Sequence, residues 1–122
     1  MTDLFGLSPS ELETARLAVE PILGVEMEAH ESSYRCGDYY RKRLPNGSEY
    51  SLQKNYDRVH DEWRYDEYRE MGTLLFVSVT DAASLEKLCS RLKSVDGVFH
   101  LHRESFSKED GYKLVRVYQD KA

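Results

Sequence analysis

Acid, histidine and cysteine side chains that could do chemistry occur at three places in this sequence. The first is His60-Asp61-Glu62, three consecutive residues that could provide general acid–base groups. Catalytic pairs need converging geometry and a pocket that shifts their pKa values, and adjacency in a polar stretch supplies neither. We therefore expect no catalytic residues here.

The second place is His100 and His102, two positions apart in an expected strand. Alternate residues of a strand point to the same face, so the two imidazoles could begin a metal site. No third ligand follows at a diagnostic spacing. We favour the alternative, in which both histidines lie on a solvated face opposite Phe99 and Leu101, and we expect no bound metal and no cofactor.

The third place is the pair Cys36 and Cys89, which are far apart and form no CxxC motif. This spacing does not support a zinc ribbon or a thioredoxin-type site. Two reduced thiols suit the cytoplasm, where disulfides are rare. The sequence also has no nucleophile-elbow serine and no glycine-rich phosphate loop. It therefore predicts a protein that is not an enzyme.

The stretch from Tyr56 to Glu70 concentrates acids and aromatic residues. It contains the only tryptophan, three tyrosines and six acids. Aromatic side chains often anchor protein interfaces, and acids around them steer a basic partner. The alternative is a solvated helix that packs Trp63 on the core. The expected partner-binding residues are Asp57, Asp61, Glu62, Trp63, Tyr65, Asp66, Glu67, Tyr68 and Glu70.

The overall charge favours a protein partner over nucleic acid. The formal net charge is -5 and the pI is about 5.4, whereas nucleic-acid binders normally carry a basic patch. The longest apolar runs fall far short of a membrane span, and the first residues lack the basic and apolar regions of a secretory signal. We expect a cytoplasmic protein with no membrane contact.

Two helices are predicted from capping and periodicity. Ser8 and Pro9 suit the first positions of a helix that should run to Glu20, because Pro21 disfavours helical geometry in the residue before it. Asp81 should cap a second helix over 82–95. The turn signal Pro45-Asn46-Gly47 predicts a β-hairpin. The expected strands are 25–30, 34–44, 49–56, 73–80, 98–106 and 112–118.

These elements predict one domain, residues 1–122, of the α+β class. Hairpins dominate, so we expect a two-layer sandwich with a mainly antiparallel sheet of about six strands and both helices on one face. The strand 73–80 is apolar on both sides, which places it inside the sheet. The expected core residues are Leu12, Val19, Val25, Met27, Leu75, Val77, Leu85, Leu88, Leu92 and Phe99.

Three stretches carry a resemblance to a known class of proteins: 31–40 (ESSYRCGDYY), 52–57 (LQKNYD) and 72–77 (GTLLFV). In these stretches, and in its size and acidity, the chain resembles immunity proteins of bacterial toxin systems, including contact-dependent growth inhibition and bacteriocins. The resemblance implies an inhibitor that binds a cognate toxin domain, such as a basic nuclease, and covers its active site or substrate path. A small enzyme using histidine and carboxylate groups, or a regulatory interaction module unrelated to toxins, remains an alternative.

Overall fold

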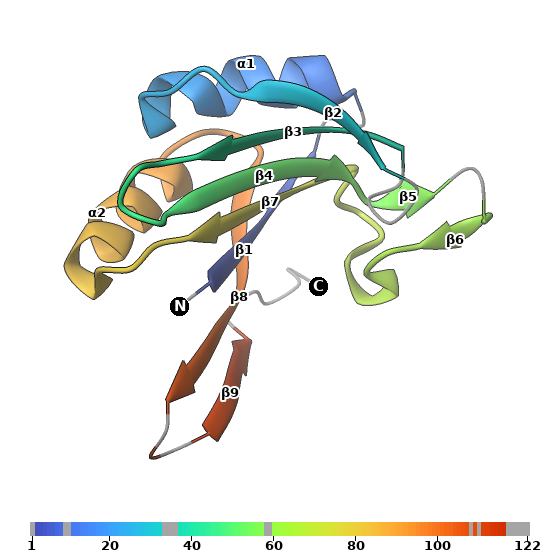
Figure 1. The fold of residues 1–122 in the computed structure, drawn as a ribbon. Helices are drawn as coiled ribbons and strands as arrows, with labels where there is room; N and C mark the ends of the chain where they lie inside the picture. Colours follow the sequence, from blue (N-terminus) through green and yellow to red (C-terminus); the bar gives the residue numbers. More distant parts are fainter. Residues whose placement is uncertain are drawn as a thin grey trace.

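The computed structural model describes residues 2–8, 11–32, 37–57, 60–107, 109 and 111–116 (Figure 1). The predicted boundaries at Pro9, Tyr34 and Tyr118 lie outside these residues, as does Cys36. The elements are α1 (Leu12–Leu23), α2 (Ala82–Lys93), a short 3₁₀ helix η2 (Asp66–Tyr68), β1 (Thr2–Leu7), β2 (Glu28–Ser32), β3 (Gly37–Arg43), β4 (Glu49–Lys54), β5 (Tyr56–Asp57), β6 (Glu62–Trp63), β7 (Thr73–Ser78), β8 (Val98–Ser107) and β9 (Gly111–Arg116).

The main sheet of the described residues has seven strands in the order β2-β3-β4-β7-β1-β8-β9, and every neighbouring pair is antiparallel. The helices share one core with one face of this sheet (Figure 1). Strands β1 and β4 both flank β7, and β7 and β8 both flank β1. Each of these pairs is therefore parallel: β1 leads to β4 through α1 and the strands β2 and β3, and β7 leads to β8 through α2, which gives two interlocked split β-α-β units. The α+β prediction is confirmed, with a larger sheet than expected.

The strand missing from the prediction is β1, which lies inside the sheet between β7 and β8. Its residues alternate between two apolar environments. Phe5 and Leu7 join the core under the helices, while Leu4 joins a second apolar cluster on the opposite face. A strand buried on both faces lacks the alternation of a half-buried strand, and in β1 the apolar residues are also interrupted by Asp3 and Gly6, which hides the pattern that revealed 73–80.

The predicted ends of the first helix are wrong. Ser8 does not cap it; Ser8 follows β1, and its backbone N–H donates to the carbonyl of Gly97. The helix begins after Glu11, and it continues through Pro21 to Leu23. Pro21 has no N–H to donate to the carbonyl of Leu17, but both residues lie on the exposed side of the helix, where water can solvate that carbonyl. Gly24 then closes the helix in the left-handed conformation, with φ 70°.

Local signals placed the second helix and the hairpin correctly. The Asp81 carboxylate accepts hydrogen bonds from the backbone N–H groups of Ala83 and Ser84, as expected of an N-cap. Helix α2 ends at Lys93, two residues before the predicted end. Gly47 has φ 90° in the turn between β3 and β4, a conformation that glycine adopts without strain.

The main core lies between the helices and the sheet and contains most of the predicted core residues. Val25 and Leu88 pack against it but are only partly buried. Phe99 was expected in the core and is instead 36% exposed, because it lies opposite Gly6 on the other face of the sheet. Among the described residues, neither helix is long and apolar enough to cross a membrane.

The opposite face of the sheet carries a second, smaller core. Leu4, Leu74 and Leu101 of the sheet pack there against Tyr68 and Met71, which come from the connection between β4 and β7. A Cβ atom on Gly6 would lie 2.5 Å from the Met71 side chain, so only glycine at this position lets Met71 approach the sheet. The smaller core therefore holds this connection against the sheet.

Candidate functional site

The predicted binding stretch lies in the connection between β4 and β7, residues 55–72, which we call the excursion. Figure 1 shows it at one end of the sheet, where it contains the two-stranded sheet β5–β6 and the helix η2. It is not the solvated helix considered from the sequence. The register pairs Tyr56 with Trp63 and Asp57 with Glu62.

Asn55 fixes the start of the excursion to its end. Its side-chain amide donates to the carbonyls of Tyr68 at 2.8 Å and Met71 at 3.0 Å, and its side-chain oxygen accepts from the backbone N–H of Tyr65 at 2.9 Å. The backbone of Asn55 adds bonds with Arg64 and Gly72. Asn55 itself is fully buried. The side chain of Asn55 thus closes a loop of about seventeen residues, because it forms hydrogen bonds with the backbone of later residues in that loop.

The three candidate aromatic anchors occupy different environments. Trp63 is partly buried, and its ring packs against Tyr56 at 5.1 Å between centroids, with the Arg69 guanidinium 5.9 Å from the ring. Tyr65 is also partly buried. Tyr68 is only 5% exposed and belongs to the smaller core. Tyr68 therefore supports the excursion, while Trp63 and Tyr65 keep part of their surface available to a partner.

Five of the six predicted acids are exposed at the outside of the excursion: Asp61, Glu62, Asp66, Glu67 and Glu70. Some also have partners within the excursion, since Asp61 accepts from the Tyr56 hydroxyl and Asp66 pairs with Arg69. Asp57 differs because it is 7% exposed. The outer side of the excursion is therefore acidic without help from Asp57.

Asp57 instead binds His60. The two side chains meet at 2.7 Å between Oδ2 and Nδ1, and this hydrogen bond and the Asp57 charge raise the pKa of His60. Ligand atoms of Asp57, His60 and Glu62 lie within 4.8 Å of one another, so the structure does gather acid and imidazole groups here. His60 and Glu62 are exposed, however, and solvent exposure opposes the pKa shifts by which an enclosed site tunes catalytic groups.

The prediction that His100 and His102 share a solvated face is wrong. Both are buried, and they lie on opposite faces of the sheet because β8 carries a bulge: His102 is opposite Leu4, but His100 is opposite Phe5. Leu101 is the extra residue between them, and an inserted residue breaks the two-residue alternation of a strand. His100 stacks on Phe5 under helix α2, while His102 joins the smaller core near Tyr68.

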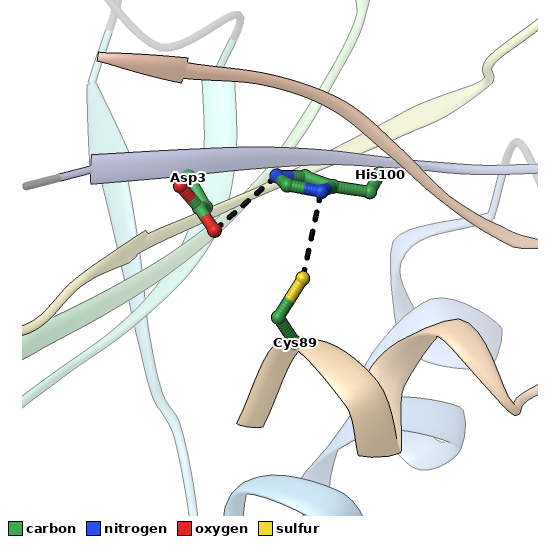
Figure 2. Close-up of side chains that lie close together, drawn as sticks. All are labelled: Asp3, Cys89 and His100. Atoms are coloured by element: carbon green, nitrogen blue, oxygen red, sulfur yellow. Dashed lines mark hydrogen bonds and ion pairs between the residues drawn. The ribbon is translucent and has the colours of Figure 1, made fainter. Parts of the chain in front are cut away.

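His100 lies between a cysteine and an aspartate that come from distant parts of the chain (Figure 2). Its Nδ1 is 3.4 Å from the Cys89 sulfur, and its Nε2 is 3.2 Å from Oδ2 of Asp3. Asp3 is completely buried and also accepts two hydrogen bonds from Arg103, at 2.7 and 2.8 Å. Burial alone would raise the pKa of Asp3, but these contacts outweigh it and hold that pKa below its ordinary value.

This line of side chains has the order of a thiol–imidazole–carboxylate relay, in which histidine activates a nucleophilic cysteine. Its environment opposes that chemistry. Cys89 is 5% exposed within the main core, and burial, aided by the charge of Asp3, raises the pKa of its thiol. A reactive cysteine needs the opposite, a lowered pKa and solvent access. We interpret the group as a polar part of the core that ties β1 and β8 to α2.

The same three residues bring ligand atoms within 4.8 Å of one another, and their types suit zinc. The Asp3 carboxylate, however, is already balanced by the Arg103 guanidinium. The absence of a bound metal and cofactor stays a prediction. Asp3 was missed in the sequence, because an acid beside Leu4 and Phe5 is expected to be exposed; acids are almost never fully buried unless they are paired, and its partner Arg103 is distant in the chain.

Comparison with known proteins does not assign this chain: no protein-family model and no curated protein matches it.

A cleft of about 480 Å³ lies at the start of α1 beside β2 and β3, and it too carries acids and tyrosines. Its acids are partly used by the fold. Glu13 pairs with Arg16 and accepts from the Tyr40 hydroxyl at 2.7 Å, and these contacts lower the pKa of Glu13 to about 2. The cleft is a second acidic surface, built mainly by the start of α1 with β2 and β3, and its lining also includes Lys54, which directly precedes the excursion.

Proposed function

We propose that this protein is an immunity protein that binds a basic bacterial toxin domain through the outer side of the excursion. The supporting observation is that one short segment presents five exposed acids while Asn55 and the smaller core fix its backbone. A toxin nuclease must bind a polyanion, so its substrate cleft is expected to be basic. An acidic inhibitor complements such a cleft.

The fixed backbone matters for affinity. Binding loses free energy whenever loops and side chains must be ordered at the interface, and a pre-organised surface avoids part of this loss. Trp63 is held by Tyr56 on one side and lies near Arg69, so its partly exposed ring is already positioned. The acids around it would mainly raise the association rate, whereas Trp63 and Tyr65 would mainly slow dissociation.

The proposed site of action is the cytoplasm, where an immunity protein meets a toxin that has entered or been made in the cell. The resemblance in stretches 31–40, 52–57 and 72–77 is consistent with this proposal. An immunity gene lies beside the gene for its toxin. The product of the neighbouring gene is therefore the partner to test first.

The test is to purify that neighbouring product with this protein and to measure binding kinetics at low and high salt. The double variant Glu62→Lys, Glu67→Lys should slow association at least tenfold at low salt, and the difference should shrink as salt screens the charges. Trp63→Ala should speed dissociation by tenfold or more. Glu26→Lys, which reverses an exposed acid outside the excursion, is the matched control and should bind like the parent.

The proposal has two separate points of failure. Folded excursion variants that bind with unchanged kinetics would exclude this surface; the acidic cleft at the start of α1 would then be the next candidate, probed by Glu11→Lys. A neighbouring product that neither binds this protein nor is toxic without it would refute the immunity function itself.

A further inference from the structure

The hairpin made by β5 and β6 brings three side chains with metal-ligand atoms together at one end of the sheet (Figure 1). Asp57 on β5 lies directly opposite Glu62 on β6, and His60 comes from the turn between them. Directly opposite residues of paired strands point to the same face, so the two carboxylates converge. One ligand atom from each of the three residues lies within 4.8 Å of the other two. The hairpin thus presents one imidazole and two carboxylates around a common point.

The electrostatics of this group favour a cation. Two carboxylates that lie directly opposite each other on neighbouring strands repel each other. The Asp57 side chain is only 9% exposed, so solvent screens its charge poorly. Glu62 forms no ion pair with a lysine or arginine in the part of the chain that the structure describes. The buried group around Asp3 differs, because the Arg103 guanidinium already binds that carboxylate. A divalent cation between Asp57 and Glu62 would replace their repulsion by attraction to both.

The backbone that carries the three ligands is fixed by hydrogen bonds of its own. Oδ1 of Asp57 accepts from the backbone N–H of His60 at 3.3 Å, which holds the turn against β5. At the base of the hairpin, the backbone N–H of Arg64 donates to the carbonyl of Asn55 at 2.7 Å. Groups that are already ordered lose less freedom when a ligand binds. Binding of an ion therefore requires movement of side chains only.

The donor set indicates which cation fits. One imidazole nitrogen and two carboxylate oxygens suit zinc, whereas magnesium and calcium prefer sets made of oxygen alone. Zinc lies about 2.0–2.2 Å from such atoms, so its ligand atoms are at most about 4.4 Å apart. The separations here meet that limit after small rotations of the His60 and Glu62 side chains, which are exposed and have room to turn.

We infer that Asp57, His60 and Glu62 bind one zinc ion, which keeps water in its remaining position. The ligand atoms are Nδ1 of His60 and one oxygen of each carboxylate. At this one place the inference replaces the sequence-based prediction of no bound metal, because the sequence did not show that Glu62 lies opposite Asp57. It does not depend on the proposed immunity function, since the isolated chain carries all three ligands.

The test is a calorimetric titration of the metal-free, untagged, full-length protein with zinc chloride. We expect saturable binding of one zinc ion per chain. His60→Gln and Glu62→Gln should each weaken this binding by about tenfold or more, because each variant removes one ligand. Both side chains are exposed, so circular dichroism should show that both variants are folded. Glu26→Gln removes an exposed acid outside the hairpin; it is the matched control and should bind zinc like the parent.

Two further measurements separate this site from other ways of binding a cation. Cobalt(II) in place of zinc should give no thiolate-to-cobalt charge-transfer band, and a strong band would place the metal on a cysteine and overturn the inference. Magnesium should give no saturable heat, and magnesium binding that His60→Gln retains would show only a general attraction of acids for cations, which would also overturn it.

The inference fails as well if the parent binds no zinc, or if both folded variants bind zinc as tightly as the parent. The immunity function is tested separately, by binding of the neighbouring gene product in the absence of zinc. Either result can therefore fail while the other stands.

Discussion

Replacing Asn55 with alanine should detach the excursion from the sheet. The buried side-chain amide of Asn55 joins the beginning of the excursion to its end, because it bonds to the backbone of Tyr65, Tyr68 and Met71. Alanine would leave these backbone groups without their partner. The smaller core alone would then have to hold the segment.

The magnitude follows from the number of bonds lost. Three strong hydrogen bonds disappear, and each buried group left unpaired costs about 1–3 kcal/mol. Entry of water into the opened loop recovers part of this, so we expect a loss of about 3–5 kcal/mol. The free energy of unfolding of a typical domain is roughly 5–15 kcal/mol, so the expected loss is a large share of it.

Urea unfolding followed by circular dichroism measures this loss, and hydrogen exchange at the Tyr65 amide shows whether the excursion opens locally. Asn46→Ala is the matched control: Asn46 also accepts a backbone N–H bond, from Ser48 at 2.9 Å, but is itself exposed. It should change stability by less than about 1 kcal/mol. A loss below about 1 kcal/mol for Asn55→Ala, with unchanged exchange at Tyr65, would refute the reasoning.

Three further predictions address buried polar groups. Because folding lowers the pKa of Asp3, the ionised carboxylate stabilises the fold at pH values above its ordinary pKa of 3.8, and this contribution is lost as the pH falls through the folded pKa. Asp3→Asn should therefore be less stable than the parent at pH 7, and its free energy of unfolding should fall less steeply in acid when unfolding is measured as a function of pH. In a Cys36→Ser background, Cys89 should not react with a thiol reagent until the protein unfolds, and rapid reaction of the folded protein would contradict its burial. Gln53→Met should raise the unfolding free energy by about 1 kcal/mol, because it removes an unpaired buried acceptor. Equal or lower stability of this variant in urea unfolding would indicate that the Gln53 oxygen does have a partner.

Features determined by local chemistry could be predicted from the sequence. Asp81 caps a helix through its own neighbouring N–H groups, and Asn46-Gly47 makes a turn from conformations available to those two residues. Strand β7 was placed inside the sheet because it is apolar on both faces. The similar pattern in β1, a strand of the same length, was overlooked because Asp3 and Gly6 interrupt its apolar residues and because it comes before any recognised element.

The candidate site could be predicted only in part, because burial depends on contacts between distant residues. The sequence indicated where acids and aromatics concentrate, but not that Tyr68 and Asp57 turn inward. It gave no means of locating the bulge at Leu101, which separates the two histidines. Asn55 looked like an ordinary polar residue, since its role depends on backbone groups ten to sixteen positions away.

The central position of β1 has a consequence for synthesis of the chain. This strand is translated before both of its neighbours, and the buried Asp3 is separated from its partner Arg103 by 100 positions. At roughly 5–20 residues per second, the ribosome needs about 5–20 s to supply β8 after β1. Until β7 has emerged, Leu4, Phe5 and Leu7 have no strand of the final sheet to pair with, and the edge of β1 that pairs with β8 stays open for the whole interval. Completion of the sheet must wait until its last central strand has emerged.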